Sequence, residues 1–250
     1  QVHTIDIPWF HQDKVTVSVL RADLVDPLVS GNKFFKLKYN LQAARAQQAD
    51  TLLSFGGYWS NHLHALAAAG KRNGFRTIGV VRGEPPEQLN ACLTDAVALG
   101  MQLHFVSRNQ YRQKTSAVFL QSLWQEFGVF YLIPEGGANL EGIRGCQELL
   151  DPALAAQFDH VMLACGTGTT MTGLITSIST PVIGVQVLQG AGYLQAEIQA
   201  QLERYKLHAL ATWQVLDDRH RGGYAKKDQV LNQFMERLSA ECPVPFEPIY

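Results

Sequence analysis

The chain has 250 residues, of which 46% are hydrophobic and 17% charged, and its formal net charge at pH 7 is −1. A chain of this length can bury a sizeable core in one large domain or two small ones. Its nearly balanced charge lacks the basic excess of a nucleic-acid-binding protein, and its longest apolar runs, at residues 77–81 and 161–165, are far too short to cross a bilayer.

From the N-terminus onwards, short segments rich in apolar and β-branched residues alternate with longer segments of helical composition. We expect strands at residues 15–20, 51–55, 77–81, 102–106, 130–133, 160–164, 182–187 and 212–215. We expect helices at residues 36–48, 61–73, 88–99, 110–127, 140–150, 171–178, 193–205 and 227–239. This alternation predicts an α/β protein with a mostly parallel sheet and helices on both faces. Because ligands of such sheets bind beyond the carboxyl ends of the strands, the residues after each strand are the first candidates for a site.

The first candidate is a lysine that follows a loop and opens a helix. Residues 30–33 are Ser-Gly-Asn-Lys, and two aromatic residues and Lys36 come directly after Lys33. A helix start and a second cation should both lower the pKa of Lys33, which an imine-forming amine requires. The alternative is a solvated basic helix start, and this motif alone favours that alternative.

The second candidate is the segment of residues 54–62, Ser-Phe-Gly-Gly-Tyr-Trp-Ser-Asn-His, between an expected strand and an expected helix. Either Ser60 or Asn61 can cap that helix. The free N–H groups of the first helical turn would suit a carboxylate. On this motif alone, the two residues are better interpreted as caps than as ligand-binding groups.

The third candidate is the segment of residues 165–170, Cys-Gly-Thr-Gly-Thr-Thr, which also follows a strand and opens a helix. Glycines let the backbone approach a ligand, and the free N–H groups with the threonine hydroxyls suit a phosphate. The Walker lysine is absent, and the third glycine of a dinucleotide motif is displaced to Gly173. The alternative is a glycine-rich turn without a ligand.

Together these segments offer a phosphate site, a carboxylate site and an amine nucleophile, which are the three anchors of a pyridoxal-phosphate site. The four cysteines are widely separated and form no Cys-x-x-Cys pair, so we expect reduced, buried thiols and a cytoplasmic protein. His62 and His64 point to different faces of a helix, which argues against a metal site.

The same segments resemble the D-cysteine desulfhydrase and 1-aminocyclopropane-1-carboxylate (ACC) deaminase family of pyridoxal-phosphate enzymes. The resemblance runs from about residue 15 to residue 250. The family's Gly-Asn-Lys-x-x-Lys-Leu-x-Tyr pattern occupies residues 31–39, and its Gly-Gly-x-x-Ser-Asn pattern occupies residues 56–61. Residues 133–139, Ile-Pro-Glu-Gly-Gly-Ala-Asn, look like the family's Ile-Pro-x-Gly-Gly segment.

The resemblance implies a role for each matching residue. Lys33 would carry the cofactor as a Schiff base, and Asn61 would bind the hydroxyl oxygen of the pyridine ring. Lys36 would assist phosphate binding by Gly166, Thr167, Gly168, Thr169 and Thr170. The substrate carboxylate would be bound by Ser60, Asn61 and His62. Ser60 also matches a serine discussed as a base or nucleophile, and two active-site tyrosines of the family match Tyr224 and Tyr250.

The resemblance also implies a tryptophan-synthase-β-like fold with two open, twisted, mostly parallel sheets flanked by helices. A smaller α/β domain at residues 38–148 would be inserted into a larger cofactor-binding domain of residues 1–37 and 149–250, with the cofactor in the cleft between them. We expect a homodimer. Relatives continue beyond the position of Tyr250, so we expect the larger domain to lack its C-terminal segment and to expose a sheet edge and apolar surface.

The implied reaction is β-elimination from a small D-amino acid such as D-cysteine. Lys33 would remove the Cα proton, and thiol or sulfide, ammonia and a 2-oxo acid would be released. ACC deaminase is the alternative activity; its ring opening has no Cα proton to remove and needs Ser60 or Tyr250 poised differently. A catalytically impaired pyridoxal-phosphate-binding protein is a second alternative. A dinucleotide-binding oxidoreductase is a third, and it leaves Lys33 and Ser60 without a role.

Overall fold

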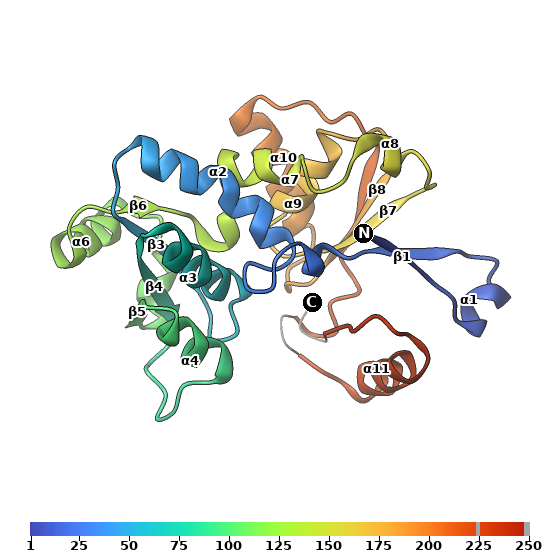
Figure 1. Ribbon diagram of the computed structural model, residues 1–250, viewed down its shortest axis with the longest axis horizontal. Coiled ribbons are helices and arrows are strands. Elements are labelled where there is room, and N and C mark those ends of the chain that lie inside the picture. The colour runs from blue at the N-terminus through green and yellow to red at the C-terminus, as the bar shows by residue number, and fades with distance from the viewer. Residues whose placement is uncertain (224–225, 248–250) are drawn as a thin grey trace. The chain divides into compact units, whose positions relative to one another are not determined.

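The computed structural model describes residues 1–223 and 226–247, without the side chain of Gln12. The chain forms two compact units, one made of Gln1–Val25 with Leu150–Tyr250 and the other of Asp26–Leu149. We call them the first and the second unit (Figure 1). The inserted domain expected at residues 38–148 lies within the range of the second unit.

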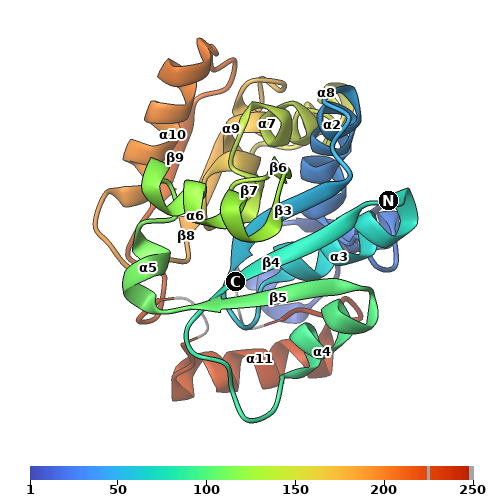
Figure 2. The same cartoon turned by 90° about the vertical axis from the view of Figure 1, so that its left-hand side faces the viewer.

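The second unit contains a parallel sheet with the strand order β5-β4-β3-β6. Figure 2 shows β3, β4 and β5 side by side. All six residues of β3 are buried, as expected for a central strand covered on both faces. The strands are β3 (Thr51–Gly56), β4 (Arg76–Arg82), β5 (Met101–Val106) and β6 (Tyr131–Leu132). The helices are α2 (Asn32–Ala46), α3 (Asn61–Asn73), α4 (Ala91–Ala98), α5 (Arg108–Arg112), α6 (Ala117–Phe127), α7 (Leu140–Cys146) and the 3₁₀ turn η2 (Glu135–Gly137).

Short polar side chains begin the helices of this unit. Ser60, Asn90, Ser116 and Asn139 each accept a hydrogen bond from a backbone N–H in the first turn of the helix that follows. Such a bond satisfies one of the four N–H groups that a helix start leaves without an internal partner. Gly74, with φ 76°, ends α3 in the left-handed conformation that favours glycine. The caps therefore fix where each of these helices starts.

The first unit contains a parallel sheet β7-β8-β9 and an antiparallel pair β1-β2 among its described residues. Its strands are β1 (Val2–Ile5), β2 (Val17–Leu20), β7 (Val161–Cys165), β8 (Val182–Gln186) and β9 (Trp213–Leu216). Its helices are α1 (Pro8–Gln12), η1 (Ala22–Val25), α8 (Pro152–Ala155), α9 (Thr169–Ile175), α10 (Tyr193–Tyr205) and α11 (Gln229–Glu241). β7 is an edge strand of the sheet, and its Met162 is exposed.

The fold class predicted from the sequence is confirmed: two parallel sheets are flanked by helices. The helices expected at residues 61–73 and 193–205 have the predicted bounds. The single helix expected at residues 110–127 is wrong, because Ser116 caps a new helix and separates α5 from α6. The antiparallel partner of β2 at Val2–Ile5 was not predicted.

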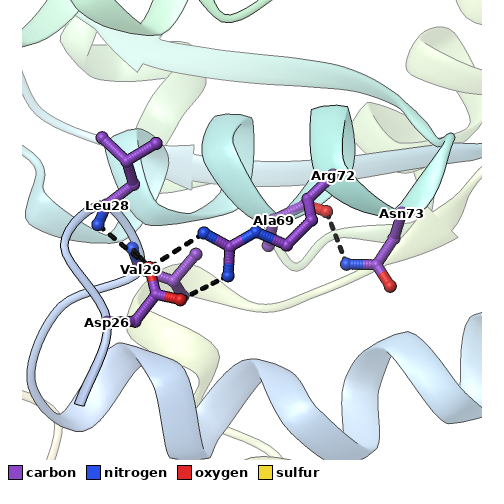
Figure 3. A network of polar contacts seen from close by, with 6 residues as sticks. All are labelled: Asp26, Leu28, Val29, Ala69, Arg72 and Asn73. Carbon is purple, nitrogen blue, oxygen red and sulfur yellow. Dashed lines mark hydrogen bonds and ion pairs between the residues drawn. The ribbon is translucent and has the colours of Figure 1, made fainter.

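A buried carboxylate anchors the start of the second unit (Figure 3). Asp26 accepts hydrogen bonds from the backbone N–H groups of Leu28, at 3.0 Å, and Val29, at 2.8 Å, and from the guanidinium of Arg72 in α3. The Arg72 guanidinium is the main cause of an Asp26 pKa far below the usual value for aspartate. The loop that leads to α2 is thereby fastened to the C-terminal turn of α3.

We predict that Asp26→Ala lowers the free energy of unfolding by about 2 kcal/mol, because two N–H groups and a guanidinium lose their acceptor. Urea denaturation at pH 7 measures the loss, with Asp50→Ala, an exposed carboxylate of the same unit, as the control. The stabilisation is present above the unfolded pKa of about 4 and is lost as the pH falls towards the lowered folded pKa. Equal losses in the two variants would contradict this role.

Candidate active site

Lys33 is the second residue of α2, as the sequence predicts. The preceding Gly31 has a φ of 63°, which turns the chain sharply into the helix. The half-buried Lys33 side chain donates a hydrogen bond from Nζ to the Asn32 side-chain oxygen at 3.1 Å. Glycine at position 145 lets α7 pack closely against this helix, since a Cβ there would lie 1.8 Å from the Phe35 carbonyl oxygen. The backbone beneath Lys33 is therefore held by tight packing of two helices.

The Lys33 amine has the lowered pKa that the sequence predicts. Its pKa is about 7, compared with 10.5 for an ordinary lysine. Desolvation by burial is the largest cause, the positive charge of Lys36 acts in the same direction, and Cys146 opposes them. The predicted cause was the helix start together with Lys36; burial is the cause that the sequence did not reveal. At neutral pH about half of the molecules carry Lys33 as a free, nucleophilic amine.

A glycine turn covers Lys36 and His62. The side chain of Lys36 is 3% exposed and donates from Nζ to the Gly136 carbonyl oxygen at 3.0 Å. A Cβ at Gly137 would lie 3.3 Å from the Lys36 Cβ and 3.7 Å from the His62 Cε1. Gly137 also has a φ of 72°. The Ile-Pro-Glu-Gly-Gly segment noted in the sequence thus needs glycine because it lies directly against two basic side chains.

His62 is a buried, neutral imidazole. It is 3% exposed, its Nε2 is 2.9 Å from the Ser54 Oγ, and Ser54 in turn donates to the Pro134 carbonyl oxygen at 3.4 Å. Burial, with the charges of Lys33 and Lys36, holds the His62 pKa well below 6.5. Among the described residues, the His62 Nδ1 is buried and has no hydrogen-bond partner, which is uncommon for a buried polar atom.

Ser60 and Asn61 lie at the start of α3, directly before that histidine. Ser60 accepts from the Leu63 N–H at 3.2 Å, so its hydroxyl caps the helix. A Cβ at Gly56 would lie 2.4 Å from the Ser60 Oγ, so the strand must end in glycine for the cap to form. Asn61 is exposed. The capping interpretation is confirmed for Ser60, and the roles of both residues in ligand binding stay predictions.

The loop of residues 166–170 lies at the carboxyl end of β7 and leads into α9. Gly168 has a φ of 74°, and a Cβ on it would lie 2.9 Å from the Ile198 Cγ1 of α10. No side-chain hydrogen bond caps α9 in the described chain. The Thr167 and Thr169 hydroxyl oxygens are 3.0 Å apart, and Thr169 is fully buried.

The predicted site residues thus fall into two groups. Lys33, Lys36 and His62 lie together in the second unit, linked by the glycine turn and by electrostatic interaction, with Ser60 and Asn61 on the helix of His62. The loop of residues 166–170 belongs to the first unit. Tyr224 and Tyr250 lie outside the described residues.

Three features of the structure were not predicted. Ser54, the partner of His62, is a polar residue between the apolar Leu53 and Phe55 of a buried strand, and this contrast was a usable signal. Gln201 donates to the backbone of the glycine loop, and nothing in its helix sets it apart from solvent-facing glutamines. Third, a pocket of about 390 Å³ lies at the carboxyl ends of β3, β4 and β5 and is lined by Gly57, Tyr58, Arg82, Gly83, Glu84 and Arg108.

Comparison with protein families identifies the class of enzyme to which this chain belongs. Residues 9–249 match the pyridoxal-phosphate-dependent enzyme family, and the chain belongs to that family. Its cofactor is accordingly pyridoxal 5′-phosphate. The family assignment confirms the enzyme class and the cofactor that the three sequence segments predict.

Three relatives with named activities match most of this chain. A putative ACC deaminase of Thermotoga maritima is 30% identical over 251 residues, which cover 94% of this chain and 80% of that protein. The bifunctional D-cysteine desulfhydrase/ACC deaminase of Arabidopsis thaliana is 26% identical, and the match covers 93% of this chain and 64% of that protein. The D-cysteine desulfhydrase of Serratia proteamaculans is 24% identical, over 94% of this chain and 77% of that protein.

The fold agrees with solved structures. The crystal structure of an ACC deaminase homologue superposes with a TM-score of 0.80 over the whole of this chain and 80% of that chain, at 23% identity. An O-ureido-L-serine synthase superposes with a TM-score of 0.62 at 19% identity, over 96% of this chain and 77% of that one. These likenesses establish the fold.

The described residues fit the cofactor of the family. Lys33 offers an amine that is partly unprotonated at neutral pH, as attachment to an aldehyde requires. The His62 Nδ1 is buried and has no hydrogen-bond partner among the described residues. The residues of the 166–170 turn are of the kind that bind phosphate. Among the described residues, no cluster of three or more His, Cys, Asp or Glu side chains could hold a metal ion, and no helix is long and apolar enough to span a membrane.

We predict that cofactor attachment to the cofactor-free protein speeds up as the pH rises through about 7 and levels off above about pH 8. The reason is that the protonated Lys33 amine is not a nucleophile and its pKa is about 7. The growth of the visible absorption band of the bound cofactor, followed by stopped-flow at a series of pH values, measures the rate. A rate that rises about tenfold per pH unit up to pH 9 would instead indicate an ordinary lysine.

We predict that the stability difference between the wild type and His62→Gln depends on pH. Glutamine keeps a group that can reach Ser54 but does not titrate. Unfolded His62 takes up a proton near pH 6.5 and the folded residue does not, so acid destabilises the wild type selectively. From pH 7 to pH 5 the wild type should lose about 2 kcal/mol of unfolding free energy relative to the variant. Urea denaturation at both pH values tests this, and a constant difference would refute a neutral His62.

Proposed function

We propose that this enzyme is a deaminating lyase of a small amino acid, similar to D-cysteine desulfhydrase. In the proposed reaction D-cysteine and water give pyruvate, ammonia and hydrogen sulfide. The observation that carries the proposal is the Lys33 amine, whose pKa of about 7 lets it act as a nucleophile and as a base near neutral pH. The named D-cysteine desulfhydrase among its relatives supports the substrate class.

The tasks of the proposed mechanism are divided among several residues. When bound, pyridoxal phosphate supplies an aldehyde to which amines add and a ring that withdraws electrons from the substrate carbon. Lys33 carries the cofactor and, once its amine is free, removes the Cα proton at Nζ. Ser60, Asn61 and His62, at the start of α3, orient the substrate carboxylate. Asn61 also donates to the hydroxyl oxygen of the cofactor ring.

The remaining residues bind the phosphate and complete the site. Gly166, Thr167, Gly168, Thr169 and Thr170 bind the phosphate through N–H and hydroxyl groups. Lys36, whose amine is buried and donates to the Gly136 carbonyl, adds positive charge. Tyr224 and Tyr250 act at the substrate. The enzyme works as a homodimer in the cytoplasm, where its free cysteines stay reduced.

ACC deamination is the second candidate. It is favoured by the similarity to the putative deaminase of T. maritima, which is 30% identical. ACC has no Cα proton, so Lys33 would have no proton to take there. Ser60 would have to release its capping bond with Leu63 to act as a base or nucleophile.

We predict a visible absorption band when the purified protein is incubated with pyridoxal 5′-phosphate, and its loss in Lys33→Ala. Lys38→Ala is the matched control, because Lys38 lies on the same helix, is partly exposed and is paired with Glu148. Release of pyruvate and sulfide from D-cysteine is then compared with release of 2-oxobutyrate from ACC. No band in the wild type would refute cofactor binding by this chain. A band without either product would indicate an impaired cofactor-binding protein, and 2-oxobutyrate alone would identify an ACC deaminase.

A further inference from the structure

A buried glutamine of α10 lies behind the glycine loop. Gln201 is 1% exposed, and all the hydrogen-bonding capacity of its amide nitrogen is used. Nε2 donates to the Thr167 carbonyl oxygen at 2.8 Å and to the Glu197 carboxylate at 3.0 Å, while Oε1 accepts from the Thr172 hydroxyl at 3.0 Å. A buried amide is costly unless it is fully paired, so these partners fix its orientation.

The bond to Thr167 determines where the next N–H group points. In a trans peptide the C=O and N–H bonds point in opposite directions. The Thr167 carbonyl oxygen is held towards Gln201 on α10, so the N–H of Gly168 must point away from α10. Among the described residues this N–H has no hydrogen-bond acceptor. Gly168 cannot be replaced without strain, since its φ is 74° and a Cβ would lie 2.9 Å from Ile198.

We propose that Gln201 is a positioning residue that aims the Gly168 N–H at the phosphate of the cofactor. The proposal rests on the proposed role of residues 166–170 in phosphate binding. Without the Nε2 donor, the peptide between Thr167 and Gly168 is free to rotate. Rotation would remove an N–H donor from the phosphate and turn the negative end of a carbonyl towards it. The affinity for the phosphate group therefore depends on an amide that lies on the other side of this peptide.

A purely structural role for Gln201 makes a different prediction. If the amide only joins α9 to α10, its loss weakens the fold and affects all ligands of the site alike. If it aims the N–H, its loss weakens the binding of a phosphorylated ligand more than that of the same ligand without phosphate. The quantity to measure is therefore the ratio of the affinities for pyridoxal 5′-phosphate and pyridoxal.

The test uses Gln201→Met and Gln201→Leu, which fill much of the same volume and lack both amide groups. We expect both variants to lose about 10- to 100-fold of the preference for pyridoxal 5′-phosphate over pyridoxal, the loss of one hydrogen bond to a charged group. If one of the two variants does not fold, the other is sufficient for the test.

Gln186→Met is the matched control. Gln186 is fully buried in the same unit, and its amide bonds the carbonyl oxygens of Leu188 and Gly190 and the N–H of Leu194 instead of the glycine loop. Gln186→Met should lower the stability of the protein and leave the preference for pyridoxal 5′-phosphate over pyridoxal unchanged. Inorganic phosphate gives a second readout that does not depend on Lys33: it should raise the melting temperature of the wild type and of Gln186→Met, and not that of the Gln201 variants.

The outcomes separate the two proposals. An unchanged preference in the Gln201 variants, or an equal loss in Gln186→Met, overturns the positioning role and leaves the proposed function intact. A wild type that neither prefers pyridoxal 5′-phosphate nor responds to inorganic phosphate overturns the phosphate role of residues 166–170, and the positioning role with it.

Discussion

The burial of basic side chains close to one another is the constraint on which the site in the second unit depends. Lys33 and Lys36 repel each other, and both hold the neighbouring His62 in its neutral form. The Lys33 amine donates to the side-chain oxygen of Asn32 and the Lys36 amine to the carbonyl oxygen of Gly136, and both acceptors are neutral. An acid in this place would raise the pKa of Lys33 again and remove its nucleophilicity. Neutral hydrogen-bond acceptors stabilise a protonated amine less than an acid would. They therefore favour the free amine that an imine-forming lysine requires.

Close packing maintains this unfavourable arrangement. Gly137 lies against Lys36 and His62, Gly145 against the backbone carbonyl of Phe35, and Gly56 against Ser60. At each of these positions a Cβ would come within 3.4 Å of its neighbour, so the backbone itself forms the wall of the site. Backbone carbonyls brought this near replace water as hydrogen-bond acceptors. Desolvation of the buried amines lowers the stability of the fold. Other interactions in the unit offset this cost, for example the bonds by which Asp26 fastens the loop before α2 to Arg72.

Much of this was predictable from the sequence, and the reasons differ from element to element. The helix at residues 61–73 was predictable because Ser60 caps its start and Gly74 ends it, so that local chemistry alone sets both bounds. The nucleophile was predictable because the run around Lys33 is specific. The cause of its low pKa was not, since burial is a property of the folded chain. The pairing of His62 with Ser54 joins residues eight apart through the end of a strand, and the bond from Gln201 to Thr167 spans 34 positions.

In the proposed site, the phosphate-binding segment depends on residues of its motif and also on a residue outside the motif. Under the proposed function, Gly168 and Thr169 of the motif would contact the phosphate. The residue that would orient them lies behind the motif: Gln201 is on α10, where nothing in the helix sequence sets it apart. Glycine can adopt many backbone conformations, so a glycine-rich loop binds phosphate well only if something rigid selects one of them. A fully paired amide on α10 is rigid in this sense, because turning it would break its bonds with Thr167, Glu197 and Thr172. The flexibility of the loop and the rigidity of its support are two requirements of one site, and the second is met outside the motif.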